Sequence, residues 1–365
     1  MSDVKHYLRK LDFPVVTTEA LHQLQKMIYE SAGQQLIRDI SEEFIFFESD
    51  RRGARRQKLT PVKELQVLER ICSYFNGHQN DQNKKTLFLY LFPPGSKLLE
   101  KRLQILVRLV SMAISIGNGS VLACIGVLMQ HVGCSAEPSL SVARTVVKDY
   151  FGMMPSWSSN GTLKNLSCVA PLFCASLTTA VTHLYFSPPR DILETILDWI
   201  VTSPTVCFIP LNLPSNYNFR PQTPLVGILQ WCVLESVSEN STLPSDGKDK
   251  QQKANIFSNL HLAVLQSMIK ISQTKSNLVY EVISPANVVH ILEKLGEKLQ
   301  NDALPSHRVE IALDRFAQAL QLALSTQCLQ TSQIKSNRLF EKLKELPHNR
   351  LLHIVIKKWS SILKD

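Results

Sequence analysis

The sequence predicts an all-α protein, arranged either as an irregular α-solenoid of HEAT-like helical repeats or as an elongated helical array. Apolar residues recur at helical spacing along the chain, and no strand-like alternation of useful length interrupts them. Glycine and proline are sparse, with 13 and 18 in 365 residues, so the long stretches between them suit helices. Such helices need neighbours on their apolar faces, which stacked helix pairs provide. A compact helical bundle is the alternative.

Helix starts and apolar stripes locate the elements of the first half of the chain. Thr17–Glu19 can open one helix, and Thr60 followed by Pro61 opens the next, as an N-cap with proline at the first helical position. Residues 97–116 and 120–132 predict an antiparallel helix pair around a Gly-Asn-Gly-Ser turn. The helix that begins at Pro61 carries an apolar stripe made of Leu65, Leu68, Ile71, Cys72 and Phe75.

Further helices are predicted at 139–150, at 190–202 directly after two prolines, and at 221–237. The proline-containing stretch 203–221 between the last two indicates an extended connector. Toward the C-terminus, one stripe consists of Leu260, Val264, Met268 and Ile271. The longest and cleanest stripe consists of Val309, Leu313, Phe316, Leu320 and Leu324, and we expect it to be buried.

Residues 236–255 are polar and offer almost nothing to bury, which is typical of a flexible linker. We therefore expect an N-terminal helical region at 1–235 and a C-terminal helical region at 256–365. The two longest uncharged stretches, 109–136 and 165–189, are interrupted by Gly117–Ser120 and by Pro171. They predict helices buried in a protein core rather than membrane spans, and the charged first fourteen residues do not form a signal-peptide core.

No catalytic, cofactor-binding or metal-binding motif is present in the sequence. It lacks the nucleophile elbow and the P-loop, and its eight cysteines include no C-x-x-C pair. Buried thiols that act as small apolar side chains explain these cysteines best. His348 and Asn349 are interpreted as turn and capping residues rather than metal ligands. We therefore expect no enzyme activity, no cofactor and no small-molecule substrate.

One segment, 51–58, holds five basic residues and no acidic one, which equals more than half of the net charge of +9 and predicts an exposed loop. Its basic residues are Arg51, Arg52, Arg55, Arg56 and Lys58. Three interpretations compete: a nuclear import signal, a contact with nucleic acid, or a solvated loop. The segment contains no aromatic residue that could stack on bases. We therefore favour import or contact with an acidic protein partner over specific RNA binding.

Four strings in the last 145 residues carry a family resemblance. They are Thr223–Gly227 with Trp231–Val233, then Leu260–Gln266, then Leu313–Gln321, and finally Leu346–Leu352. Together, and in this order, they resemble the Integrator complex subunit 15 family. Shorter strings between residues 64 and 200 match in the same order, so the resemblance covers most of the chain.

The resemblance implies a nuclear, non-catalytic scaffold or adaptor of the Integrator complex. Such a protein would link the auxiliary module, subunits 10, 13 and 14, to the core in RNA polymerase II transcription termination and small nuclear RNA 3′-end processing. The third string contains Asp314 and Arg315, which we predict as partner contacts because an arginine can form a bidentate pair at an interface. The alternative function is a helical nucleic-acid-binding protein that uses residues 51–58.

Overall fold

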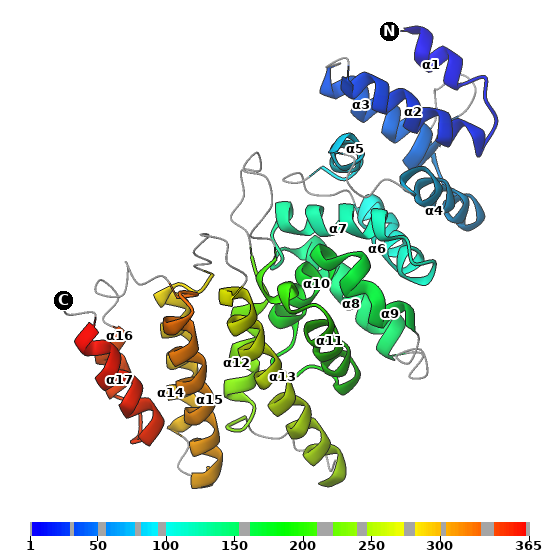
Figure 1. The fold of residues 1–365 in the computed structure, drawn as a ribbon. Helices are drawn as coiled ribbons and strands as arrows, with labels where there is room; N and C mark the ends of the chain where they lie inside the picture. Colours follow the sequence, from blue (N-terminus) through cyan, green and yellow to red (C-terminus); the bar gives the residue numbers. More distant parts are fainter. Residues whose placement is uncertain are drawn as a thin grey trace. The chain divides into compact units, whose positions relative to one another are not determined.

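The computed structural model describes residues 2–29, 33–49, 56–76, 82–93, 100–152, 161–209, 222–238, 247–273, 282–300, 304–329 and 339–362. The described chain is almost entirely helical (Figure 1), which confirms the all-α class and the helical array. It forms two compact units. Unit 1 comprises residues 1–177 with 216–219, and unit 2 comprises 178–215 with 220–365.

Unit 1 is built from short helices that pack in alternation. Helix α2 contacts α4, α4 contacts α6 and α6 contacts α8, whereas α3 contacts α5 and α5 contacts α7. Helices α2 to α6 thus each meet the helix two places further along the chain, as stacked helix pairs do. The helices are α1 (Ser2–Leu8), α2 (Val15–Tyr29), α3 (Gln34–Ser41), α4 (Pro61–Phe75), α5 (Gln82–Leu91), α6 (Glu100–Ser115), α7 (Gly119–Val132), α8 (Glu137–Val147) and α9 (Gly161–Val169).

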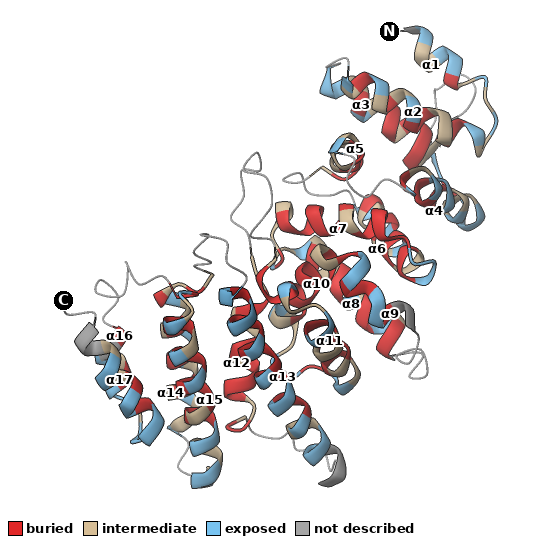
Figure 2. Cartoon of the chain, viewed as in Figure 1, coloured by how far each residue is buried: buried red, intermediate tan, exposed pale blue. Residues whose placement is uncertain are grey.

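Unit 2 repeats this alternation, and its α13 and α15 are the two longest helices of the described chain. Helices α11, α13, α15 and α17 contact one another in that order, and α12, α14 and α16 form a second row. The helices are α10 (Pro171–Leu184), which carries the boundary between the units, α11 (Arg190–Thr202), α12 (Leu225–Leu234), α13 (Gly247–Gln273), α14 (Pro285–Leu299), α15 (Ser306–Ser325), α16 (Leu339–Lys344) and α17 (Arg350–Ile362). Within each unit, buried residues lie on the helix faces turned toward neighbouring helices (Figure 2).

Local signals place several of these helices where the sequence predicts them. The Thr60 side chain accepts a hydrogen bond from the Lys63 amide and Pro61 begins α4, as expected for an N-cap and a first-turn proline. Helix α11 has the predicted bounds. Between α6 and α7, Gly117 adopts a φ of 66°, and Asn118 caps α7 by accepting from the Val121 amide at 3.1 Å.

A two-stranded antiparallel sheet was not predicted. Strand β1 (Phe47–Ser49) pairs with β2 (Arg56–Lys58), with Phe47 opposite Lys58 and Ser49 opposite Arg56. Each strand has only three residues, so no alternation of apolar and polar side chains develops. The expectation that residues 51–58 form a loop is therefore wrong at Arg56–Lys58, which pair with β1. Strand β1 follows a π-helical turn at Glu42–Phe46 that ends α3.

The predicted stripes are confirmed except at two positions. On α15, four of the five stripe residues are buried, but Val309 is half-buried because it lies in the first turn of the helix. On α4, Leu65 is 50% exposed, whereas Val67 is fully buried. The buried face of α4 is thus rotated slightly from the predicted one and begins at Val67.

Part of the predicted linker is helical. Residues 239–246 lie outside the described residues, and α13 begins at Gly247. The two compact units divide at 177/178, and the division at 236–255 stays a prediction. The predicted connector at 203–221 begins with a 3₁₀ turn at Pro204–Phe208, and residues 210–221 lie outside the described residues.

No single helix among the described residues is long and apolar enough to cross a membrane. One pair, Leu163–Val169 with Pro171–Leu184, passes the test of length and composition together and is bent by 119° at the break.

Candidate functional site

The basic segment 51–58 spans the connection of the β1–β2 hairpin and its second strand. Arg51, Arg52 and Arg55 lie outside the described residues, and Arg56 is described only by its place on β2. Lys58, at the end of β2, is exposed. The pKa of Lys101 is lowered, first by burial and also by the positive charge of Lys58. The described part of this segment is thus solvent-facing and locally positive, and its role stays a prediction.

Arg315, predicted as a partner contact, is 9% exposed and binds within unit 2. One terminal nitrogen of its guanidinium donates to the Cys232 carbonyl at 2.7 Å and to the Glu235 carboxylate at 3.1 Å. The other donates to the Ser258 hydroxyl at 2.8 Å. A single side chain of α15 therefore ties α15 to α12 and to α13.

The end of α12 explains why an arginine occupies this position. The last four carbonyls of a helix have no partner within the helix and carry its partial negative charge. Cys232 lies in this last turn, since α12 ends at Leu234. Arg308, seven residues before Arg315 on α15, donates to the carbonyls of Ser236 and Ser238 just beyond the helix. Helix α15 thus supplies two cations to the C-terminal end of α12.

Asp314 connects α15 to α17. Its carboxylate accepts a hydrogen bond from the Asn349 side-chain nitrogen at 2.7 Å. The Asn349 side-chain oxygen accepts from the Leu352 amide at 2.9 Å, which confirms the predicted capping role of Asn349 at the start of α17. The third and fourth strings that the sequence singles out are therefore joined directly. The role of Asp314 and Arg315 toward a partner protein stays a prediction.

His261, in the second string, joins α13 to α15. Its Nε2 lies 3.2 Å from the Gln318 side-chain oxygen, while its Nδ1 has no hydrogen-bond partner in the described structure. Burial lowers the pKa of His261 to about 4. The ring is therefore neutral at physiological pH and serves packing, as a buried imidazole flanked by leucines does.

The first string packs α12 against the end of α10. A Cβ added at Gly227 would lie 2.3 Å from the Thr182 hydroxyl oxygen, so only glycine permits this close approach. The Trp231 indole nitrogen donates to the Tyr185 carbonyl at 2.8 Å. All four strings thus meet in unit 2. Their polar contacts form what we call the α15 network, made of Arg308, Asp314, Arg315 and Gln318 with their partners on α12, α13 and α17.

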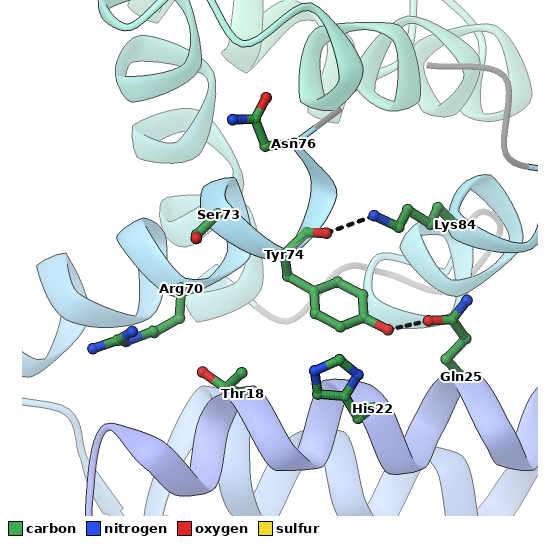
Figure 3. A pocket seen from close by; sticks show the side chains of 8 residues that line it. All are labelled: Thr18, His22, Gln25, Arg70, Ser73, Tyr74, Asn76 and Lys84. Carbon is green, nitrogen blue, oxygen red and sulfur yellow. Dashed lines mark hydrogen bonds between the residues drawn. The ribbon is translucent and has the colours of Figure 1, made fainter. Parts of the chain in front are cut away.

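A polar pocket of about 400 Å³ lies between α2, α4 and α5 of unit 1 (Figure 3). Lys84 donates to the Tyr74 carbonyl at 2.7 Å, and the Tyr74 hydroxyl donates to the Gln25 side-chain oxygen. The His22 ring packs edge-on against the Tyr74 ring with centroids 4.9 Å apart. The pocket is lined by Thr18, His22, Gln25, Arg70, Ser73, Tyr74, Asn76 and Lys84.

This lining contains two cations and no carboxylate, which suits an anionic group. Sequence reasoning missed the pocket because its residues come from three helices, and none of them belongs to a local motif.

Comparison with known proteins identifies the family. A family model described as Integrator complex subunit 15 matches residues 2–348. The chain is 32% identical over 391 residues to Integrator complex subunit 15 of Danio rerio, which covers 98% of this chain and 81% of that relative. The chain belongs to the Integrator complex subunit 15 family. Its identity to the Homo sapiens member is 32% over 402 residues, covering 98% and 87% of the two chains. Its identity to the Drosophila melanogaster member is 31% over 372 residues, covering 95% and 94%.

Membership of the Integrator complex subunit 15 family confirms the resemblance carried by the four strings. The family match includes all of α12, α13 and α15 and ends one residue before Asn349. It therefore contains nearly the whole α15 network. The name of the family is that of a subunit of a complex, and it gives no catalytic activity.

The side-chain chemistry of this family member agrees with a structural role for its thiols. All eight cysteines lie within the described residues as thiols outside disulfides, and all except Cys168 are buried. Burial raises the pKa of the Cys207 and Cys232 thiols to about 12, so both stay protonated and unreactive near neutral pH. Among the described residues, no group of three or more His, Cys, Asp or Glu side chains could hold a metal ion.

Proposed function

We propose that this chain is a non-catalytic scaffold subunit of the Integrator complex in the nucleus. In this proposal it links the auxiliary module, subunits 10, 13 and 14, to the core of the complex, and thereby serves RNA polymerase II transcription termination and small nuclear RNA 3′-end processing. The observation that carries the proposal is the family match across residues 2–348, together with relatives that are all named Integrator complex subunit 15.

The surface of unit 2 supports a binding role. Helices α13, α15 and α17 lie side by side and expose apolar side chains. These side chains are Leu262, Ile269, Ile311, Leu351 and Ile354. Apolar side chains gathered on neighbouring helices of a soluble array favour contact with another protein, since exposure to water is unfavourable. Repeated helices also present long surfaces that suit several partners at once.

Depletion of the chain from cells tests the linking role. A tagged core subunit is purified from nuclei before and after depletion, and subunits 10, 13 and 14 are quantified by mass spectrometry. We expect the three auxiliary subunits to leave the core while they still purify with one another, and we expect re-expression of the chain to restore their recovery. Auxiliary subunits that stay bound to the core in depleted cells would contradict the linking role.

The alternative function, nucleic-acid binding through residues 51–58, predicts a different dependence on salt. Each neutralised phosphate releases counterions, so the affinity for DNA or RNA would fall steeply as salt rises. The purified chain is titrated with duplex DNA and with single-stranded RNA at several salt concentrations. A steep dependence that becomes shallower when the five basic residues are neutralised would favour the alternative over a purely protein-binding role.

A further inference from the structure

A groove of about 480 Å³ runs between α14 and the end of α16 in unit 2. Its floor is apolar and is formed by Leu292, Leu299, Leu346 and Pro347. Of these, Leu292 is buried, while Leu346 is half-buried and Pro347 is exposed, so the apolar floor is open to solvent. The remaining lining residues are Glu293, Gly296, Glu297, Gln300, Lys342 and Glu345.

The groove is acidic although the chain is basic, with a net charge of +9. Three carboxylates line it against one ammonium group, and Lys342 is already bound to Glu293 at 2.7 Å. Glu297 and Glu345 make no ion pair within the described structure. These two carboxylates lie beside an apolar floor. The groove is therefore complementary to a segment that carries lysine or arginine together with apolar side chains.

The lysines of α14 do not neutralise this groove, because they face another side of the helix. Lys298 lies over the Phe186 ring, with its ammonium nitrogen 5.3 Å from the ring centroid. Lys294 lies close enough to His183 to lower the pKa of that ring, after the larger effect of burial. Helix α14 therefore turns its carboxylates toward the groove and these two lysines toward the end of α10.

Gly296 gives an independent reason to expect an occupant. A glycine inside a helix destabilises it relative to alanine, because it loses more backbone freedom on folding. At Gly126 and Gly227 the chain itself explains the glycine, since an added Cβ would lie 2.8 Å from the Phe173 amide nitrogen or 2.3 Å from the Thr182 hydroxyl. A Cβ at Gly296 would meet nothing within 4 Å. Packing within the described chain thus gives no cause for this glycine, which leaves the backbone of α14 bare along the groove.

We propose that the α14–α16 groove binds a basic amphipathic segment of another Integrator subunit, an inference that rests on the proposed scaffold function. Lysine or arginine side chains of the segment pair with Glu297 and Glu345. Its apolar side chains cover Leu346 and Pro347, and its backbone approaches α14 at Gly296. The missing side chain at Gly296 makes room for that approach, as glycines do where two backbones come close.

Substitution of Gly296 separates stability from binding. Gly296→Ala and Gly296→Gln place side chains into open space, and both residues are better helix formers than glycine. We expect each variant to melt roughly 2–4 °C higher than the natural chain. We also expect each to bind its partner more weakly, with the larger glutamine having the stronger effect. A merely structural glycine would not combine these opposite effects.

Charge reversal gives a matched comparison. Glu297→Lys places a cation near the C-terminal end of α14, where the helix dipole tolerates it, so the fold is preserved. The control is Glu69→Lys, which makes the same change of net charge at an exposed position on α4 of unit 1, outside the groove. Tagged full-length chains are purified from nuclear extract, and every Integrator subunit is quantified by mass spectrometry.

We expect Glu297→Lys and Gly296→Gln to lower the recovery of at least one Integrator subunit roughly tenfold, and Glu69→Lys to leave it unchanged. Carbodiimide coupling of the natural assembly should join Glu297 or Glu345 to a lysine of that same subunit. Equal recovery by all three variants, each folded and each still recovering Integrator, would overturn the groove proposal alone. A natural chain that recovers no Integrator subunit would overturn the scaffold function and the groove proposal with it.

Discussion

Replacement of Arg315 by methionine should destabilise unit 2 strongly. Methionine keeps most of the apolar stem of the arginine, so the change removes mainly the guanidinium contacts. The buried Cys232 carbonyl loses its 2.7 Å donor, and the Glu235 carboxylate loses its cation. A buried polar group left without its partner costs about 1–3 kcal/mol. The Glu235 side chain is 23% exposed, so water replaces part of what it loses.

Together, these lost contacts should lower the free energy of unfolding of unit 2 by about 2–4 kcal/mol in Arg315→Met. Hydrogen-exchange mass spectrometry measures this loss locally, which suits a chain of two compact units. Amides of α12 and α15 should lose protection by roughly 30- to 1,000-fold, because each 1.4 kcal/mol corresponds to a factor of ten.

Arg190→Met is the matched control in the same unit. Arg190 pairs with Glu194 one turn further along α11, both side chains being 45% exposed, and it also donates to the Gln252 side-chain oxygen at an exposed position on α13. An exposed ion pair between residues i and i+4 of a helix contributes only about 0.3–0.5 kcal/mol to stability. If Arg315→Met changed protection no more than Arg190→Met does, the role assigned to the α15 network would be refuted.

Four further predictions follow from the described contacts. Phe316→Ala should lower stability by about 3–5 kcal/mol in thermal unfolding because the ring is buried, and unchanged melting would contradict that burial. The pKa of His261 is depressed to about 4, so the unfolded chain takes up the proton first as pH falls below 6.5. The contribution of the neutral His261 ring to the free energy of unfolding should therefore be complete above pH 6.5 and fall by on the order of 3 kcal/mol toward pH 4. His261→Gln should remove this part of the pH dependence. Iodoacetamide should label Cys168 before the seven buried thiols in the folded chain, and equal labelling of all eight would count against the packing. Neutralising the basic residues of segment 51–58 should change stability by no more than ~0.5 kcal/mol each and should move the protein from nucleus to cytoplasm if the segment serves import, which fluorescence microscopy of the tagged variant measures.

Strong local signals made part of the fold predictable from sequence. Thr60 followed by Pro61 fixes the start of α4 through one capping bond and one favourable φ angle, both decided by adjacent residues. The start of α11 after two prolines and the buried stripe of α15 are of the same kind. Such features are decided by residues that are close in sequence, so they can be predicted without knowledge of the tertiary packing.

Other features depend on neighbours distant in sequence and could not be predicted. The β1–β2 hairpin consists of two three-residue strands, too short for a pattern to develop. The polar first turns of α13 resemble a linker in composition, because few of their residues are buried. Leu65 fits a helical stripe but lies at its edge, where only the position of neighbouring helices decides whether a side chain is covered.

The candidate sites show the same division. The strings that contain Arg315 and Asn349 were recognised from sequence, but the contact of Arg315 with Cys232 joins residues 83 positions apart. The pocket in unit 1 and the α14–α16 groove likewise combine residues from separate helices with no shared motif. Sequence reasoning can therefore identify such residues without identifying the surface that they form.

Affinity purification of the tagged full-length chain from nuclei, followed by quantitative mass spectrometry, tests the central claim most directly. The proposed function predicts recovery of subunits 10, 13 and 14 together with core Integrator subunits in near-equal amounts, resistant to nuclease treatment. Recovery of the chain in a stable assembly that contains no Integrator subunit would contradict the claim.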